Sequence, residues 1–277
     1  MGAIKRIQLE INGTCPRSCS ECLPAGLKTG AMLSLKALEP LALEWAAAGI
    51  EAITLAGFGS SVAHPEFPDI LDCLSNRFRV AVVCRPSEVT QCLGATQVIV
   101  SVQTYEDARQ LDQVLASTRP TCQVSTHTIT SPFILKELDW ILVCLLNNRW
   151  ISRVNVADAL KLCNDPAHIR AIRECSKPRL EVISMLDKAR RERYRGDIIT
   201  QCLEGHFPEK CAFHDDLIYV DASLRIRLCC HQPTLGALGN LNSETLPEAL
   251  KTVAIFQANW RQHPACMKCP DTGGSHA

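Results

Sequence analysis

The sequence predicts an α/β fold in which six strand–helix units build a parallel sheet and a small second domain follows. Short β-branched segments alternate with amphipathic segments from residue 4 to about residue 185, which is typical of repeated strand–helix units. The length of 277 residues suits one large α/β unit with an appendage. With 47% hydrophobic and 21% charged residues, the chain has enough apolar material for a full core.

The six units follow one another along the first part of the chain. We expect strands at residues 4–11, 52–56, 79–84, 97–103, 122–127 and 151–156. We expect helices at residues 34–48, 67–76, 87–93, 106–117, 134–146 and 166–175. The first helix has clear ends, because Ser34 is a good N-cap residue and Gly49 is a good terminator.

A change of composition predicts the second domain. Residues 187–196 carry five positive charges and predict a solvated connector. We therefore assign residues 1–195 to the first domain and residues 196–277 to the second. In the second domain we expect strands at 217–220 and 224–228 and a helix at 246–260.

Composition and charge exclude several classes of function. Lys and Arg number 29, as do Asp and Glu, so the chain lacks the basic footprint of a protein that binds nucleic acid. No apolar run approaches the roughly 20 residues that cross a bilayer, and the N-terminus shows no secretion signal. We therefore expect a cytoplasmic protein with no membrane partner. Its sixteen cysteines then favour metal ligands or small buried residues over disulfides.

A first cysteine cluster follows the first expected strand. Cys15, Cys19 and Cys22 form a Cys-x3-Cys-x2-Cys array on a loop. Three thiolates can hold three irons of a [4Fe-4S] cube and leave the fourth iron open, while zinc completed by a distant ligand, or no metal, is the alternative. The carboxyl end of a strand in a β/α array is also where such folds place active sites.

This loop resembles the cluster loop of the radical S-adenosylmethionine (SAM) enzymes, and the six units resemble the partial (β/α)6 TIM-like barrel of that family. The resemblance implies that Cys15, Cys19 and Cys22 bind the cluster and that SAM chelates the open iron. It also implies that an electron from the cluster releases a 5'-deoxyadenosyl radical, which abstracts hydrogen from carbon. The chain departs from the family at Glu21, where an aromatic residue is usual.

A glycine-containing turn after the second expected strand is the next point of resemblance. The family carries a Gly-Gly-Glu-Pro-like turn that meets the amino group of SAM, and this chain has Ala-Gly-Phe-Gly-Ser-Ser at 56–61, without the acidic residue. The fourth and fifth expected strands end at a rim where family members bind nucleoside or substrate. The candidate contacts are Gly57, Phe58, Gly59, Ser60, Gln103 and His127. A tight turn and structural hydrogen bonds are the alternatives.

A second cysteine cluster lies in the C-terminal domain. Cys211, Cys229, Cys266 and Cys269 can close a second [4Fe-4S] cube that has no free iron. Zinc is the alternative, although a zinc ribbon uses Cys-x2-Cys at both ends and this chain has it at one. The arrangement resembles the twitch domain, a shortened SPASM domain of radical SAM enzymes. Aminoglycoside-pathway members are similar, namely neomycin-type epimerases and butirosin-type dehydrogenases.

Two adjacent cysteines, Cys229 and Cys230, suggest how the reaction ends. If Cys229 ligates the second cluster, the side chain of Cys230 points to the opposite side of an extended segment. A thiol S–H can give its hydrogen to a carbon radical, so we predict that Cys230 makes the enzyme an epimerase. Cys230 as a small buried residue, or as the ligand in place of Cys229, is an equal alternative.

The substrate we expect is a sugar or an aminoglycoside, because the chain shows no extra domain for gripping a leader peptide. A cationic substrate needs carboxylates, and the candidates are Glu10, Asp158, Asp215 and Asp216. A dehydrogenase of an aminocyclitol alcohol, a peptide-modifying epimerase and a non-catalytic metal scaffold remain open. Radical SAM chemistry also implies an electron donor such as flavodoxin or ferredoxin.

Overall fold

The computed structural model describes residues 4–16, 30–130, 134–158, 197–201, 216–227 and 237–259. The chain divides into two compact units. Unit 1 comprises Met1–Val82, Gly94–Thr96 and Pro208–Ala277, and unit 2 comprises Val83–Leu93 and Gln97–Phe207. None of the helices in the described ranges is long and apolar enough to cross a membrane.

Unit 1 is built on parallel strands from both ends of the chain. Strand β1 (Arg6–Leu9) pairs with β2 (Ala52–Leu55) on one side and with β8 (Leu217–Val220) on the other, parallel to both. Strand β3 (Arg79–Cys84) continues the sheet beyond β2. On the far side of β8, strands β9 (Arg225–Arg227) and β10 (Ala237–Asn240) add an antiparallel edge.

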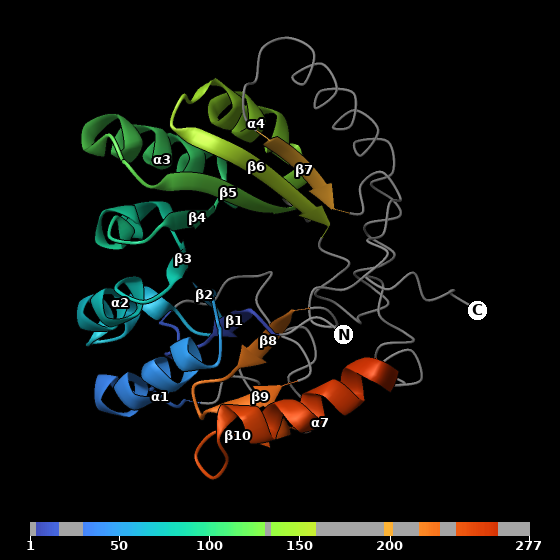
Figure 1. Ribbon diagram of the computed structural model, residues 1–277. Coiled ribbons are helices and arrows are strands. Elements are labelled where there is room, and N and C mark those ends of the chain that lie inside the picture. Colours follow the sequence, from blue (N-terminus) through green and yellow to red (C-terminus); the bar gives the residue numbers. More distant parts are fainter. Residues whose placement is uncertain are drawn as a thin grey trace. The chain divides into compact units, whose positions relative to one another are not determined.

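The strands of unit 1 bury alternate side chains, as expected when helices cover one face of a sheet. Ile7 and Leu9 of β1 are fully buried, and so are their neighbours Ile53 and Leu55 of β2. Helices α1 (Leu35–Ala47), α2 (Phe67–Ser75) and α7 (Leu246–Asn259) belong to this unit. They are labelled in Figure 1. As predicted, the Ser34 hydroxyl caps α1 by accepting from the Ala37 amide, and Gly49 has the positive φ of a helix terminator.

Unit 2 is a second set of parallel strands with its own helices. Strands β4 (Gln97–Ser101), β5 (Gln123–Thr130), β6 (Ile151–Asp158) and β7 (Asp197–Gln201) pair in that order. The connections contain a 3-10 helix at Pro86–Cys92, helix α3 (Tyr105–Thr118), a 3-10 turn at Ile134–Lys136 and helix α4 (Leu138–Asn147). Helices α3 and α4 pack against each other, and α4 also packs against β6.

Most expected elements are confirmed within a few residues, and three elements differ from expectation. The segment expected as a helix at 87–93 is a 3-10 helix that begins at Pro86, and it is too short to gain much from α-helical hydrogen bonding. Strand β7 was not expected, because its short apolar core follows the charged run at 187–196. Strand β10 was not among the expected strands. The helix expected at 166–175 lies outside the described residues.

The C-terminal segment contributes strands to the same sheet as the N-terminal strand. Tyr219 of β8 is level with Gln8 of β1 and belongs to the same compact unit. The predicted domain boundary at residue 195 falls within unit 2. The assignment of residues 196–277 to a separate twitch-like domain stays a prediction.

Candidate functional site

Backbone hydrogen bonds join the two ends of the loop that carries the first cysteine cluster. The Gly13 amide donates to the Ala31 carbonyl at 2.7 Å, and the Leu33 amide donates to the Ile11 carbonyl at 2.9 Å. The Cys15 thiol is half-buried and forms no disulfide. Cys19 and Cys22 lie outside the described residues. The structure thus places the first cysteine directly beyond the carboxyl end of β1, on a segment whose base is fixed.

The turn after β2 is hydrogen-bonded to the start of this loop, at Asn12 and Thr14. The Ser60 amide donates to the Thr14 carbonyl at 3.0 Å, and the Asn12 side chain donates to the Ser60 carbonyl at 2.9 Å. A Cβ atom at Gly59 would lie 1.7 Å from the Asn12 carbonyl oxygen, and one at Gly57 would lie 2.3 Å from Oε2 of Glu10. Both positions therefore require glycine for close approach within the protein. The expected contacts of Gly57, Phe58, Gly59 and Ser60 with a cofactor stay a prediction.

Asn12 organises the start of the loop, a role that the sequence did not reveal. Its Oδ1 accepts from the Thr14 amide at 2.9 Å and from the Thr14 hydroxyl at 2.7 Å. An asparagine directly after a strand favours such a local turn, and this was the available signal. Asn12 is buried, and its side chain joins the segment leading to Cys15 to the turn after β2.

The exit of the loop is held by residues that follow the same turn. Oε2 of Glu66 accepts from the Leu35 amide at 3.1 Å, at the first residue of α1. Nδ1 of His64 accepts from the Glu66 amide at 3.0 Å, and burial lowers the pKa of His64. The imidazole is therefore neutral near pH 7 and serves as an acceptor within the protein.

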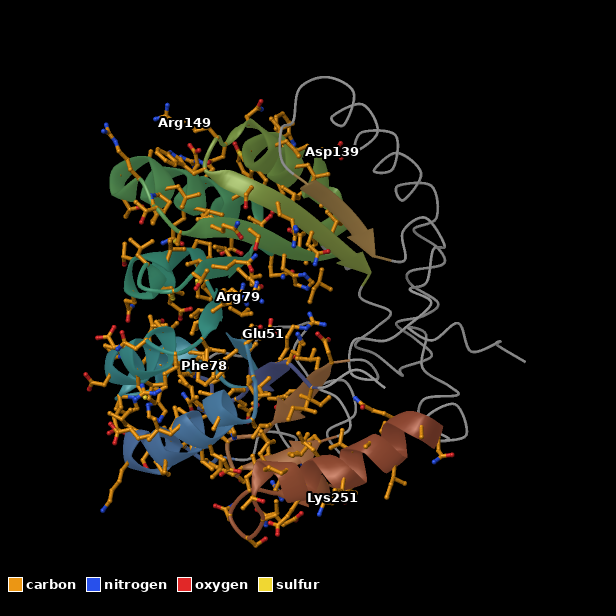
Figure 2. The ribbon with its side chains drawn as sticks, in the orientation of Figure 1. Glu51, Phe78, Arg79, Asp139, Arg149 and Lys251 are labelled. Carbon is orange, nitrogen blue, oxygen red and sulfur yellow. The ribbon has the colours of Figure 1, made fainter. Side chains whose placement is uncertain are left out.

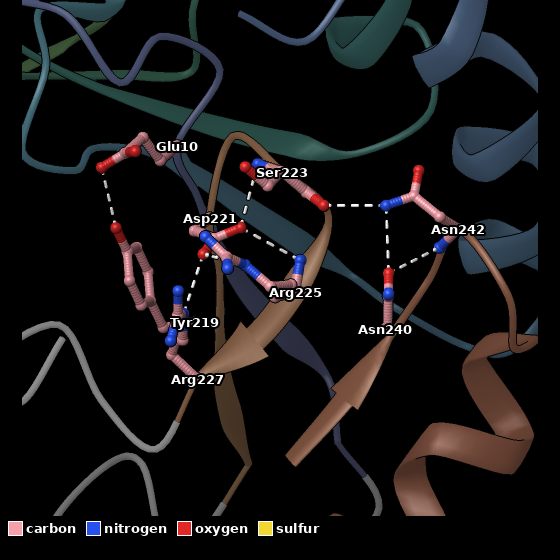
Figure 3. A network of polar contacts seen from close by, with 8 residues as sticks. All are labelled: Glu10, Tyr219, Asp221, Ser223, Arg225, Arg227, Asn240 and Asn242. Carbon is pink, nitrogen blue, oxygen red and sulfur yellow. Dashed lines mark hydrogen bonds and ion pairs between the residues drawn. The ribbon is translucent and has the colours of Figure 1, made fainter. Parts of the chain in front are cut away.

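Glu10 is a buried carboxylate at the carboxyl end of β1. Its side chain is 1% exposed, and Oε2 accepts from the Phe58 amide at 2.6 Å. Oε2 also accepts from the Tyr219 hydroxyl at 2.8 Å (Figure 3). The Phe58 ring meets the Tyr219 ring edge to face, with 6.1 Å between centroids. The carboxylate thus joins β1, the glycine turn and the C-terminal strand β8.

The environment of Glu10 favours its protonated form. Burial raises the pKa of Glu10, whereas the hydrogen bonds from Phe58 and Tyr219 and the nearby amide of Ala222 oppose this shift, and the charge of Asp221 adds to it. Oε1 is buried and has no hydrogen bond of normal geometry to the described residues. Glu10 was predicted as a substrate carboxylate, and the structure shows that one of its oxygens is already used within the protein.

Asp221 holds the turn that follows β8. It is 2% exposed, and its oxygens accept from the amides of Ser223 and Arg225 and from the guanidinium groups of Arg225 and Arg227 at 3.1 and 2.8 Å (Figure 3). The side chain of Asn242 donates to the Ser223 carbonyl at 2.8 Å and extends the same network. All the oxygens of Asp221 therefore have structural partners.

Of the other carboxylates predicted for substrate binding, the structure describes the side chain of Asp216 alone. Asp216 lies at the amino end of β8 and forms a bidentate ion pair with Arg6. At the same end of the strands, Glu51 pairs with Lys5 at 2.6 Å and with Arg79 at 3.4 Å, and Figure 2 labels Glu51 and Arg79. Active sites of β/α folds lie at the opposite, carboxyl end, so we leave Asp216 out of the site. The side chains of Asp158 and Asp215 lie outside the described residues.

In unit 2, Gln103 lies just beyond the end of β4, as expected, whereas His127 lies inside β5, which continues three residues past the expected strand end. The Gln103 side-chain amide donates to the Ser101 hydroxyl at 3.0 Å, and its backbone amide donates to Asp107. Pairing of β4, β5 and β6 makes Ser101, His127 and Asn155 level with one another. Asn155 was missed, because its register with His127 depends on strand pairing that the sequence does not reveal.

The second cysteine cluster and the doublet, Cys211, Cys229, Cys230, Cys266 and Cys269, lie outside the described residues. Within the part that the structure describes, no three His, Cys, Asp or Glu side chains are grouped as metal ligands. Gly239 lies in β10, and a Cβ atom added to it would lie 2.8 Å from that of Ala249 in α7. This glycine permits close packing of the C-terminal helix on the sheet.

Comparisons with known proteins identify the fold. No family model and no curated protein matches the chain. The structure of Streptococcus suis SuiB bound to S-adenosylmethionine aligns with a TM-score of 0.66 at 11% identity, covering 98% of this chain and 72% of SuiB. SuiB bound to its precursor peptide SuiA aligns with a TM-score of 0.64 at 12% identity, covering 99% and 67%.

A complex of BtrN with AdoMet and 2-DOIA aligns over 94% of this chain and 88% of BtrN at 11% identity. Its TM-score of 0.46 is too low to support an argument about fold. The two SuiB alignments confirm the α/β class predicted from the sequence. The chain has the partial β/α-barrel fold of SuiB.

Proposed function

We propose that this protein is a radical SAM enzyme whose catalytic [4Fe-4S] cluster is held by Cys15, Cys19 and Cys22. The observation that carries the proposal is the position of Cys15, directly beyond β1 on a loop with a fixed base, in a fold shared with a protein crystallised with S-adenosylmethionine. Thiolates are the usual ligands of such a cluster, and the half-buried thiol of Cys15 fits that use. When bound, the cluster supplies the electron that cleaves SAM and so provides an oxidant for a carbon–hydrogen bond.

The residues around the loop prepare this site. Asn12, Thr14 and Ser60 fix the backbone from which the cysteine array starts, so little conformational freedom remains to be lost when iron binds. The backbone of the turn at Gly57–Ser60 lies beyond the carboxyl end of β2, next to the start of the cysteine loop. We propose that this turn contacts SAM, as the sequence resemblance implies.

We propose further that the enzyme is an epimerase. Cys230 would give its thiol hydrogen to the substrate carbon from the face opposite the abstraction, and the resulting sulfur radical would regain an electron and a proton. Cys211, Cys229, Cys266 and Cys269 would hold an auxiliary [4Fe-4S] cluster in a C-terminal twitch-like domain. A flavodoxin or ferredoxin would supply electrons in the cytoplasm, and the substrate would be a sugar or an aminoglycoside.

A second candidate function is modification of a peptide. SuiB was crystallised with its precursor peptide SuiA, and that structure aligns over 99% of this chain. The candidates differ in the substrate, while the cysteine array and its chemistry are common to both. A dehydrogenase that needs no thiol donor is distinguished by the Cys230 variant below.

The test is anaerobic reconstitution of the purified chain. We expect about four irons per cluster, an absorbance typical of iron–sulfur centres, and cleavage of SAM to 5'-deoxyadenosine under strong reductant. Cys15→Ala should lose about four irons and all SAM cleavage. Cys73→Ala, a half-buried cysteine on α2, is the matched control and should keep both. Wild-type protein that holds no reducible cluster contradicts the proposal.

Cys230→Ala tests the epimerase specifically. The variant should still form 5'-deoxyadenosine but lose the inverted product. Wild-type product made in deuterated water should carry deuterium at the inverted carbon. Unchanged turnover by the variant favours the dehydrogenase.

A further inference from the structure

The side chain of Asn12 connects the two segments that are proposed to meet the cluster and SAM. Its Nδ2 donates to the Ser60 carbonyl at 2.9 Å, in the turn after β2. Its Oδ1 accepts from the amide and the hydroxyl of Thr14 at 2.9 and 2.7 Å, directly before Cys15. The Ser60 amide in turn donates to the Thr14 carbonyl at 3.0 Å. Asn12, Thr14 and Ser60 therefore form a closed ring of hydrogen bonds.

The two polar atoms of the Asn12 carboxamide cannot exchange roles. The backbone amide of Thr14 is a donor only, so the atom that faces it must be the carboxamide oxygen. The carbonyl of Ser60 is an acceptor only, so the atom that faces it must be the carboxamide nitrogen. Backbone polarity thus settles an assignment that is often ambiguous for an amide side chain. The oxygen serves the cysteine loop, and the nitrogen serves the turn.

Asn12 acts through its neighbours and not by contact with a ligand. It is only 1% exposed, whereas Cys15 and Ser60 are half-buried and Gly57 is exposed. A molecule beyond the carboxyl ends of β1 and β2 can therefore reach the cysteine and the turn but not the carboxamide. This combination of burial and contacts is that of a positioning residue.

The turn has a second attachment to the same segment. A Cβ atom at Gly59 would lie 1.7 Å from the Asn12 carbonyl oxygen and 2.5 Å from the Thr14 carbonyl oxygen, so the two backbones are in close contact. This contact and the bond between the Ser60 amide and the Thr14 carbonyl do not involve the Asn12 side chain. When that side chain is replaced, the turn should shift and not detach, so the variants should fold.

We infer that Asn12 is a positioning residue whose two polar atoms have separate roles: the oxygen holds the start of the cysteine loop so that the cluster is retained, and the nitrogen holds the turn so that SAM binds. The inference rests on the proposed function, and it deepens that function by assigning cluster retention and SAM affinity to different atoms of one side chain. A substitution that removes only the nitrogen should weaken SAM binding and spare the cluster.

The experiment measures SAM affinity and cluster retention separately in the full-length, reconstituted protein. SAM binding is measured by equilibrium dialysis without reductant, so that SAM is not cleaved. Cluster retention is the rate at which a ferrous-iron chelator removes iron in the absence of SAM. Asn12→Ser keeps an oxygen that accepts from the Thr14 amide, and it is too short to serve Ser60 as well. Asn12→Asp, measured at about pH 8, also keeps the acceptor and lacks the donor, whereas Asn12→Leu lacks both.

The expected results separate the two roles. Asn12→Ser and Asn12→Asp should weaken SAM binding about threefold to tenfold, as expected when one contact between coupled segments is lost, while iron removal stays within about twofold of wild type. Asn12→Leu should weaken SAM binding to a similar extent and should also speed iron removal about threefold to tenfold.

Asn148 supplies a matched control. It is buried at the amino end of β6, where its oxygen accepts from the Trp150 amide at 2.9 Å and its nitrogen donates to Asp112 at 2.7 Å. Asn148→Ala therefore removes the same pair of hydrogen bonds away from the cysteine loop. It should lower the melting temperature but leave SAM affinity and iron removal within about twofold of wild type.

Hydrogen exchange of the apoprotein provides a measurement that needs no cluster. In Asn12→Ser, exchange should become faster at residues 57–60 and stay unchanged at Thr14 and Cys15. In Asn12→Leu, exchange should become faster at both places. A general loss of stability would instead raise exchange at both places in every variant.

Three results would overturn the inference. The first is wild-type SAM affinity in both Asn12→Ser and Asn12→Asp. The second is iron removal that speeds up in these two variants in proportion to the loss of SAM affinity, because the carboxamide would then support the site as one unit. The third is an equal loss of SAM affinity in Asn148→Ala, which would trace the effect to stability alone.

Failure of the inference and failure of the proposed function are distinguishable. SAM cleavage that depends on Cys15, together with wild-type SAM affinity in Asn12→Ser and Asn12→Asp, leaves the enzyme assignment standing and removes the separate roles of the two atoms. A wild-type protein that holds no cluster, together with the expected difference in exchange between Asn12→Ser and Asn12→Leu, removes the enzyme assignment and leaves the two atoms holding different segments.

Discussion

Glu10 offers a sharp test of the site's electrostatics, because its buried carboxyl group is shared by three segments. Glu10→Gln keeps an oxygen that accepts from the Phe58 amide and the Tyr219 hydroxyl, and it removes the cost of burying a charge. Glu10→Leu removes the oxygen that accepts from the Phe58 amide and the Tyr219 hydroxyl. Loss of the acceptor of a buried hydrogen bond costs about 1–3 kcal/mol, so we expect the leucine variant to be about 2 kcal/mol less stable than the glutamine variant.

The pH dependence follows from the raised pKa of Glu10. In the unfolded chain the carboxyl group titrates near the ordinary value of 4.5, while the folded protein retains the proton to higher pH. Stability from the protonated group is complete below that ordinary value and is lost as the pH rises through the folded pKa. Relative to Glu10→Gln, the wild type should therefore lose free energy of unfolding as pH rises above 4.5, by at most about 1.4 kcal/mol per pH unit, and then level off.

The assay is urea unfolding of the apoprotein at several pH values, followed by tryptophan fluorescence, with Trp45 as a buried reporter. The difference in free energy of unfolding between wild type and Glu10→Gln is the quantity to plot. A difference that increases with pH would mean that the pKa is lowered and would refute the argument from burial. A leucine variant as stable as the glutamine variant would refute the role of the Tyr219 hydrogen bond.

Other predictions address the glycine turn, the amino-end ion pair and the C-terminal turn. Gly59→Ala should prevent normal folding or lower the free energy of unfolding in urea by more than about 3 kcal/mol, because its Cβ atom would overlap backbone atoms. In the control Gly94→Ala, the Cβ atom meets Leu71 at an ordinary 3.6 Å, so the free energy of unfolding should change by less than about 0.5 kcal/mol. Asp216→Asn should leave SAM cleavage unchanged and cost less than about 1 kcal/mol, because the pair with Arg6 is partly exposed at the far end of the strands. Asp221→Asn should cost about 3 kcal/mol, measured by thermal unfolding, because it leaves two guanidinium groups without their carboxylate; a loss below about 1 kcal/mol would contradict that role.

Local patterns predicted the regular elements well. Helix α1 was identified from apolar spacing, Ser34 and Gly49, and the structure confirms each signal. Strand β3 was predicted with its observed bounds, because alternation along a covered strand is a local property. Strand β8 was also predicted, but not its pairing with β1, since that contact joins residues about 210 positions apart.

Contacts between residues far apart in the sequence also account for the parts of the candidate site that were not predicted. Gly57 and Gly59 were singled out for close approach, and the structure shows approach to Glu10 and Asn12, partners that only the fold reveals. Glu10 was predicted to bind substrate, and its hydrogen bond from Tyr219 was not foreseen because that contact spans most of the sequence. Asn155 carried no local signal, and its place beside His127 comes from strand register.

The pairing of β8 with β1 has a consequence for biogenesis. A nascent chain lacks residues 217–220 until about 210 residues after β1 have been made, and until then β1 lacks its β8 partner and Glu10 lacks its hydrogen bond from Tyr219. An uncovered strand edge is also prone to association with other chains. If the proposed cluster binds on the Cys15 loop, iron that arrives before residues 217–220 have been made would meet a loop whose supporting sheet is incomplete, so insertion of the cluster should follow synthesis of β8.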